Sequence, residues 1–154
     1  MIRVATLLIL LAALALPTAM LAQGTAAPVH AFVAPDAIQY EPFEVPGFAS
    51  GIRLAVIHGD PTAASGAYTV RIAFPDGYRF PAHYHPKDEN VTVLNGTFKL
   101  AMGTDESAPV ETFTPGSYLY LPAQQPHFGS VEGETVLQLH GEAPFQIILA
   151  NPGT

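Results

Sequence analysis

Short runs of alternating apolar and polar residues fill the chain from Ile38 onward, and they predict a succession of β-strands. Most of these runs are rich in β-branched or aromatic residues, which favour a pleated, half-buried surface. No long segment after Ala22 carries the apolar stripe of an amphipathic helix. The predicted strands are 38–43, 52–58, 68–74, 78–85, 90–94, 97–102, 110–114, 117–121, 127–131, 135–140 and 145–150.

Turn residues separate these runs. Asn95-Gly96 stands between two apolar runs and predicts a two-residue hairpin turn. Pro75-Asp76-Gly77, Pro115-Gly116 and Glu132-Gly133 predict further turns. Many short, evenly spaced strands in one small domain indicate an all-β fold, either a sandwich or a barrel.

The composition supports a folded domain and restricts its chemistry. The chain has 154 residues, of which 49% are hydrophobic and 12% charged, the opposite of a disordered chain. It has no cysteine, so any metal site must use nitrogen and oxygen donors. The formal net charge of −7, without a cluster of Lys or Arg, argues against binding to nucleic acid or to anionic lipid.

The first residues have the pattern of a secretory signal peptide. Arg3 precedes an apolar run, Pro17 interrupts it and small residues follow, so we expect a signal peptide over 1–22. An uncleaved membrane anchor is the alternative, because the run is just long enough to span a bilayer. With cleavage, we expect a periplasmic or secreted protein that has no membrane segment. Residues 23–36 would form an N-terminal arm and residues 37–154 the folded domain.

The stretch around His83 and His85 carries the candidate chemistry. Alternate side chains of a strand share one face, so both imidazoles would point the same way, roughly 7 Å apart. Glu89 follows four positions after His85, and His127 lies at the end of a later predicted strand. These four side chains could converge on one metal ion. The alternative is that the two neighbouring histidines merely lie on a solvated face near a turn.

The donor types limit the metal without identifying it. Neutral imidazole suits Zn, Cu, Fe and Ni, and a carboxylate adds charge that favours harder ions such as Mn or Fe. Four protein ligands on an octahedral ion would leave positions for water, dioxygen or substrate, which is what separates a catalytic from a structural site. We therefore expect one divalent transition metal among Fe, Mn, Cu, Ni and Zn.

These residues also carry a family resemblance. The spacing Gly77, His83, His85, Glu89 and Gly96 resembles the first motif of the cupin superfamily, with every signature position filled. The spacing Gly116, Pro122 and His127 resembles the second motif. Two positions depart from it, because Gln124 stands where the family usually has Gly and Val131 where it often has Asn.

The resemblance implies an antiparallel jelly-roll β-barrel with one divalent metal at its centre. The implied metal ligands are His83, His85, Glu89 and His127. Small, secreted or periplasmic single-domain cupins are the most similar members of the superfamily, which implies a location and a fold but no substrate. Barrels with an open sheet edge often pair, so a homodimer is a further expectation.

Three functions remain open from the sequence. The first is an oxidoreductase of dioxygenase type that acts on a small phenolic or diketone-like molecule, with Glu89 able to act as a base; a metal-dependent isomerase or decarboxylase is a variant of this reading. The second is a non-catalytic module that binds a small molecule or senses a metal, and the third is a barrel stabilised by its metal. His140 could serve as a general base if it faces the pocket with Gln138, or it could face outward if Leu137 and Leu139 face in.

Overall fold

A computed structural model describes residues 32–150, which all belong to one compact unit. The expected signal peptide over 1–22 and most of the expected arm over 23–36 lie outside the described residues. No helix within 32–150 is both long enough and apolar enough to cross a membrane. A short 3-10 helix, η1 (Pro35–Ala37), opens the described part, and everything after it is strand or loop.

Nine antiparallel strands form the described part of the domain, whereas the apolar pattern predicted eleven, because two pairs of predicted strands are continuous as β5 and β8. They are β1 (Glu41–Pro42), β2 (Arg53–His58), β3 (Ala67–Phe74), β4 (Arg79–Tyr84), β5 (Glu89–Met102), β6 (Glu111–Phe113), β7 (Tyr118–Leu121), β8 (His127–Glu142) and β9 (Ile148–Leu149). The first and last predicted strands shrink to two residues each, β1 and β9. The prediction of an all-β jelly-roll fold is confirmed.

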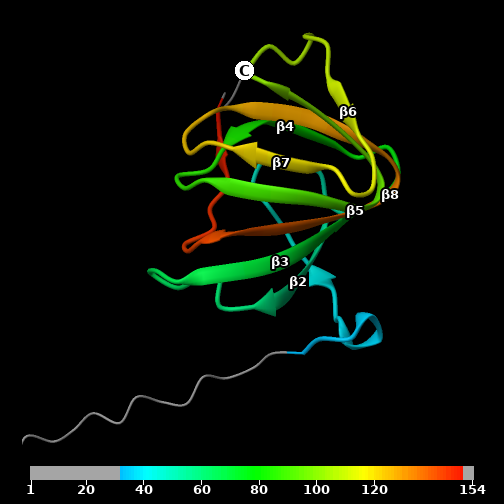
Figure 1. Cartoon of the computed structure of the whole chain (residues 1–154). Helices are drawn as coiled ribbons and strands as arrows, with labels where there is room; N and C mark the ends of the chain where they lie inside the picture. Colours follow the sequence, from blue (N-terminus) through cyan, green and yellow to red (C-terminus); the bar gives the residue numbers. More distant parts are fainter. Residues whose placement is uncertain (1–31, 151–154) are drawn as a thin grey trace, which may run out of the picture. The chain divides into compact units, whose positions relative to one another are not determined.

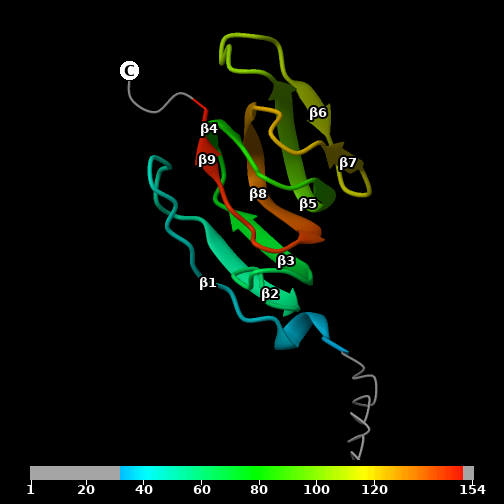
Figure 2. The same ribbon diagram turned by 90° about the vertical axis from the view of Figure 1, so that its left-hand side faces the viewer.

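The two longest strands, β5 and β8, organise the sheet. They pair with each other along nearly their whole length. The first half of β8 lies beside β4 and its second half lies between β5 and β3 (Figure 1). In the same way β5 pairs with β7 through its first half and with β6 through its second. The pair β5–β8 therefore belongs to both halves of a curled sheet. Figure 2 shows β2 and β3 on one side of β8 and β5 to β7 on the other.

The predicted hairpin at Asn95-Gly96 is wrong, and so is the turn at Glu132-Gly133. Both dipeptides lie inside long strands, where the register between β5 and β8 shifts. Gly96 has φ +78°, and a Cβ there would collide with the side chain of Thr135. The glycine permits a close approach of two bent strands, so the pairing continues through the bend. The turns at Pro75–Gly77 and Pro115–Gly116 are confirmed.

The core lies on the inner surface of the curled sheet. Side chains alternate between inside and outside along the strands, for example along β7, where Leu119 and Leu121 are buried and Tyr118 and Tyr120 are exposed. The inward residues of β3, β5 and β8 form one apolar cluster. The buried polar side chains within 32–150 are His83, His85, Glu89, His127 and Thr135. Four of these five are the donors that the sequence singled out.

Candidate metal centre

Three histidines meet at the inner surface of the sheet. His83 lies on β4 and is the cross-strand partner of His127, the first residue of β8. His85 follows directly after β4, so strand alternation places it on the same side as His83. One ring nitrogen from each of the three histidines lies within 4.8 Å of the others. The alternative in which the histidines lie on a solvated face does not hold, because all three are buried.

Backbone carbonyls fix the orientation of all three rings. His83 Nδ1 lies 2.8 Å from the Pro81 carbonyl oxygen, and His85 Nδ1 lies 2.7 Å from the Gln146 carbonyl oxygen. His127 Nδ1 lies 3.2 Å from the Gln125 carbonyl oxygen. A carbonyl oxygen can only accept, so each Nδ1 donates a proton and each Nε2 keeps its lone pair. This arrangement is the usual way in which proteins hold a metal-ligating imidazole.

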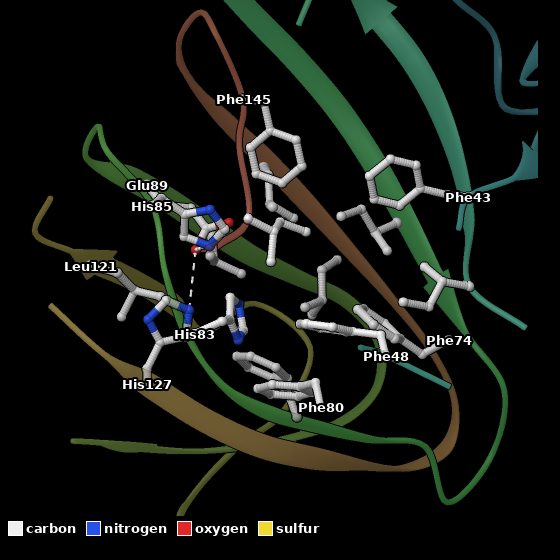
Figure 3. A pocket seen from close by; sticks show the side chains of 17 residues that line it. Phe43, Phe48, Phe74, Phe80, His83, His85, Glu89, Leu121, His127 and Phe145 are labelled. Atoms are coloured by element: carbon white, nitrogen blue, oxygen red, sulfur yellow. Dashed lines mark ion pairs between the residues drawn. The ribbon is translucent and has the colours of Figure 1, made fainter. Parts of the chain in front are cut away.

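Glu89 adds a carboxylate beside this cluster. It is the first residue of β5, and its Oε2 lies 3.4 Å from His85 Nε2 and 3.9 Å from His127 Nε2. Figure 3 shows Glu89 and the three imidazoles gathered at one end of the cavity, with Phe43 and Phe74 toward the other end. Three of the four donors therefore come from β4, β5 and β8, and His85 comes from the residue directly after β4.

Burial disfavours charge on each of the four groups. It lowers the pKa of His83 to about 2, with smaller contributions from His127 and His85, and it lowers the pKa of His85 to about 4. It also lowers the pKa of His127 and raises that of Glu89 to about 7. The histidines are thus neutral at physiological pH, the form that binds metal. A divalent cation would supply the positive charge that a buried Glu89 carboxylate lacks, so the donor set fits such an ion.

Apolar side chains make up the rest of the cavity. Its volume is about 50 Å³, while one water molecule needs roughly 10–15 Å³ by this measure, so the space holds a few waters or a ligand of a few atoms. No Lys or Arg lines it. Besides the four donors, the lining residues are Phe43, Phe48, Ile52, Ile72, Phe74, Phe80, Val91, Phe98, Leu121, Leu137, Leu139, Phe145 and Ile147.

The loop 122–126 ties the ligand-bearing segments together. The Ala123 N–H donates to Asp88 Oδ1 at 2.8 Å, and the Gln124 N–H donates to the His85 carbonyl at 2.8 Å. Asp88 precedes Glu89 and also accepts a hydrogen bond from Tyr120 at 2.9 Å. Gln124 has φ +61°, which explains why the family usually has Gly at this position. Gln124 adopts this left-handed backbone conformation at a cost that glycine would not have.

Sequence reasoning missed one of the aromatic residues that touch the histidines, Phe48. Phe48 packs edge-on against His83, with ring centroids 5.1 Å apart, and Phe145 stacks on His85 at 5.3 Å. The sequence predicts Phe145 as a core or pocket-lining residue, and it lines the cavity, but nothing in the local pattern around Phe48 indicates a place there. The strand pattern likewise gives no signal for Asp88, whose role depends on contacts with the distant Ala123 and Tyr120.

His140 lies away from this cavity. Leu137 and Leu139 are buried in the cavity wall, so alternation along β8 turns His140 outward, where it is exposed. There it lines a separate open groove with residues that include Lys87 and Glu142. The expectation that His140 faces the pocket is therefore wrong, and Gln138, which has the same parity, is absent from the cavity lining and accepts a hydrogen bond from Arg71.

Comparisons with known proteins agree with this architecture. The profile of the ChrR cupin-like domain family matches residues 29–146. A search of curated proteins finds no match. Among solved structures, the polyketide cyclase RemF from Streptomyces resistomycificus aligns with a TM-score of 0.67 and 17% identity, over 81% of this chain and 88% of its own.

Two further solved structures show the same fold. A Methylibium petroleiphilum protein, provisionally assigned as an acetylacetone dioxygenase, aligns with a TM-score of 0.63 and 20% identity, over 83% of this chain and 85% of its own. The DMSP lyase DddQ from Ruegeria pomeroyi aligns with a TM-score of 0.60 and 18% identity, over 77% of this chain and 64% of its own. Identities this low establish only the fold, whereas the family profile covers most of the chain. The chain therefore belongs to the ChrR cupin-like domain family of the cupin superfamily.

Proposed function

We propose that this protein binds one divalent transition metal through His83, His85, His127 and Glu89. We further propose that it is an oxidoreductase of dioxygenase type, acting on a small organic molecule with a phenolic or diketone-like oxygen donor. The observation that carries the metal proposal is the orientation of the three imidazoles. Each Nδ1 is held by a backbone carbonyl, which leaves three converging Nε2 lone pairs. Such an arrangement has no use in an ordinary apolar core.

The protein residues would perform four tasks at this site. The imidazoles and the carboxylate would hold the ion, which supplies Lewis acidity and, for a redox-active metal, electron transfer. The apolar walls exclude water from the reacting groups and strengthen electrostatic interactions there. Glu89 is the sole carboxylate in the cavity lining, so it would have to accept any proton that the substrate releases. Apart from the four proposed metal ligands, no acid–base group lines the cavity, which favours oxidation over hydrolysis.

The fold relatives are consistent with small-molecule chemistry. A polyketide cyclase, a protein provisionally assigned as an acetylacetone dioxygenase and a DMSP lyase share this architecture. Their reactions differ from one another, so the relatives support a small organic substrate and leave the reaction type to experiment. Isomerisation and decarboxylation are therefore tested in the same substrate panel.

The test combines metal analysis with turnover. The protein is isolated from its native compartment, its metal content is measured by elemental analysis, and oxygen uptake is followed with a panel of catechols, other phenols and β-diketones. We expect close to one transition metal per chain and oxygen uptake with at least one compound. Loss of uptake in His83→Ala, with the exposed His58→Ala as matched control, would assign the activity to this site. A metal-loaded protein that turns over none of the panel, with or without oxygen, would refute the enzymatic proposal.

One observation favours a second candidate, a non-catalytic module that binds a metal or a very small ligand. The cavity of about 50 Å³ is well below the roughly 300–1,000 Å³ typical of pockets for organic ligands. A closed coordination sphere, seen as a Co(II) spectrum that no added ligand changes, would support this candidate. An open sphere would favour the enzyme.

Two further proposals concern the context of the protein. The apolar run over 1–22 leads us to propose export from the cytoplasm with removal of this segment, which N-terminal sequencing of the protein from its native compartment would test. We also propose a homodimer, because β6 and β7 each pair only with β5 among the described strands and so present open edges. Light scattering of the purified protein would measure its mass.

A further inference from the structure

The mouth of the cavity is formed by two segments near the sheet margin. Most lining residues are fully buried, but four are only partly buried: Phe43, Phe48, Phe145 and Ile147. Phe43 and Phe48 belong to the connection between β1 and β2, and the other two belong to the connection between β8 and β9. These two segments therefore form the part of the cavity wall that is partly exposed to solvent, and we take them as its mouth.

Of these four residues, Phe48 contacts one of the donors directly. Its ring packs edge-on against the His83 imidazole, with centroids 5.1 Å apart and an interplanar angle of 72°. The Phe48 N–H donates to the Val45 carbonyl at 3.0 Å, which makes a tight turn of this segment. The ring therefore fills the space next to a donor, and removing it would enlarge a cavity that now measures about 50 Å³.

The segment that carries Phe48 has few attachments. It is closed at its base by the Phe43 N–H, which donates to the Ile52 carbonyl at 2.9 Å, and Tyr78 donates to the Ala49 carbonyl at 2.5 Å. Gly47 and Gly51 have φ of +83° and +110°, and glycine reaches such conformations without steric cost. Backbone rotation at these two residues could swing the Phe48 ring while the Phe43–Ile52 hydrogen bond stays in place, but the hydrogen bond from Tyr78 to Ala49 would have to break or shift with the segment.

Phe145, on the other side of the mouth, is linked through its neighbour to a donor. Its own N–H donates to the Pro61 carbonyl at 2.7 Å, and the Ala143 N–H donates to the Gly66 carbonyl at 2.8 Å. The next residue, Gln146, provides the carbonyl that orients His85. Displacing Phe145 would therefore disturb a donor, whereas the carbonyl that orients His83 belongs to Pro81, remote in sequence from Phe48. Of the two aromatic residues, Phe48 is the one that can move without loss of the donor geometry.

We infer that Phe48 determines which molecules reach the donor cluster: it admits a molecule with one small donor group and excludes a larger apolar body until its ring moves aside. This inference rests on the proposed metal centre, since the size limit is defined relative to the ion. The rest of the mouth and wall is apolar, so the part of the ligand that replaces the Phe48 ring must be apolar as well.

The test uses Co(II)-loaded protein and two probes with the same donor atom. Imidazole is the small probe and 4-phenylimidazole the large one, and binding is followed by the change in the visible Co(II) spectrum. The variants are Phe48→Ala and the milder Phe48→Leu. Phe113→Ala is the matched control, because Phe113 is also a partly buried phenylalanine, packs on Phe98 with centroids 6.4 Å apart and is absent from the cavity lining.

We expect the parent protein to bind imidazole and to bind 4-phenylimidazole at least about tenfold more weakly, a range typical of steric discrimination in pockets. Phe48→Ala should tighten 4-phenylimidazole binding about tenfold or more, Phe48→Leu should do so to a smaller extent, and Phe113→Ala should change neither. Imidazole affinity should change less than about threefold, since its donor site is intact. If Phe48→Ala fails to fold, the change in 4-phenylimidazole affinity in Phe48→Leu alone tests the inference.

The possible failures separate the two proposals. If imidazole binds but 4-phenylimidazole binds equally well to the parent, or is unaffected by either Phe48 variant, the role of Phe48 is refuted while the open metal centre stands. A Co(II) spectrum that imidazole does not change shows a closed coordination sphere, which refutes the enzymatic proposal and the inference together. A protein that takes up no Co(II) refutes the metal centre itself.

Discussion

Two parts of the cavity wall, the donor cluster and the mouth, are built in different ways. The donor cluster consists of residues on or next to β4, β5 and β8, which neighbouring strands hold in register. The mouth consists of residues on the connections 43–52 and 143–147, which a few backbone hydrogen bonds hold in place. Strand pairing fixes which face a side chain occupies, because a shift of one residue would turn it to the other face. A connection between strands can be repositioned at little cost. We infer that the metal chemistry is set by the rigid part and access by the adaptable one.

The largest expected effect comes from removing a donor. His127→Ala should lower the metal content from about one ion per chain to a small fraction, because three well-placed imidazoles and a carboxylate become two imidazoles and a carboxylate. Elemental analysis after dialysis measures this change. His140→Ala and His58→Ala serve as controls, since both histidines are exposed and outside the cavity, and their metal content should match the parent. Loss of metal from His140→Ala would contradict the boundary drawn here between the cavity and the outer groove.

The pH dependence of the stability of the metal-free protein tests whether the three histidines are buried. The histidines have a pKa of 6.5 when unfolded, while burial lowers it to about 4 in His85 and to about 2 in His83, and also lowers that of His127. Below pH 6.5 the unfolded chain therefore takes up protons that the folded chain does not, and stability falls as the pH decreases.

Glu89 works against this trend in part of the range. Its pKa is 4.5 when unfolded and about 7 when folded, so it favours the folded state as the pH falls from 7 to 4.5. Three histidines outweigh one carboxylate, and we expect the melting temperature of the metal-free protein to drop steadily from pH 7 to pH 5. Calorimetry at fixed ionic strength measures it. A melting temperature that is flat or rising toward pH 5 would show that the histidines are solvated.

A smaller effect is expected from removing the hydrogen bonds of Asp88, the residue before Glu89. Asp88→Ala removes the acceptor for the Ala123 N–H and for Tyr120, so the loop 122–126 and the start of β5 lose a direct connection. We expect metal affinity to fall about tenfold, the lower end of the range for residues that orient metal ligands. A competition titration with a chromophoric chelator gives the affinity. Asp105→Ala is the control, because Asp105 also accepts from a backbone N–H and a hydroxyl, both of Ser107, and is absent from the cavity lining.

The smallest expected effect concerns the turn before His127. Gln124 has φ +61°, a conformation that costs a side-chain-bearing residue about 1 kcal/mol. Gln124→Gly relieves this strain but adds freedom to the unfolded chain, so we expect a net gain of about 0.5 kcal/mol. Urea unfolding should show a higher midpoint with an unchanged slope, while metal affinity stays the same. A lower midpoint would mean that the Gln124 side chain makes a stabilising contribution of its own.

From the sequence alone the fold class could be predicted, and four candidate donors could be named. The alternation of apolar and polar residues predicted the strands, since each side chain chooses its face by local parity, and the spacings around His83 and His127 resemble the two cupin motifs. The tertiary structure decided where local signals were ambiguous. Asn95-Gly96 has the composition of a hairpin turn, but β5 stays paired with β8 on both sides of it, with a shift in register. His140 has no local signal for inside or outside, and the burial of Leu137 and Leu139 turns it out. Phe48 and Asp88 gain their places only from residues distant in sequence, because the path of a connection depends on what it packs against.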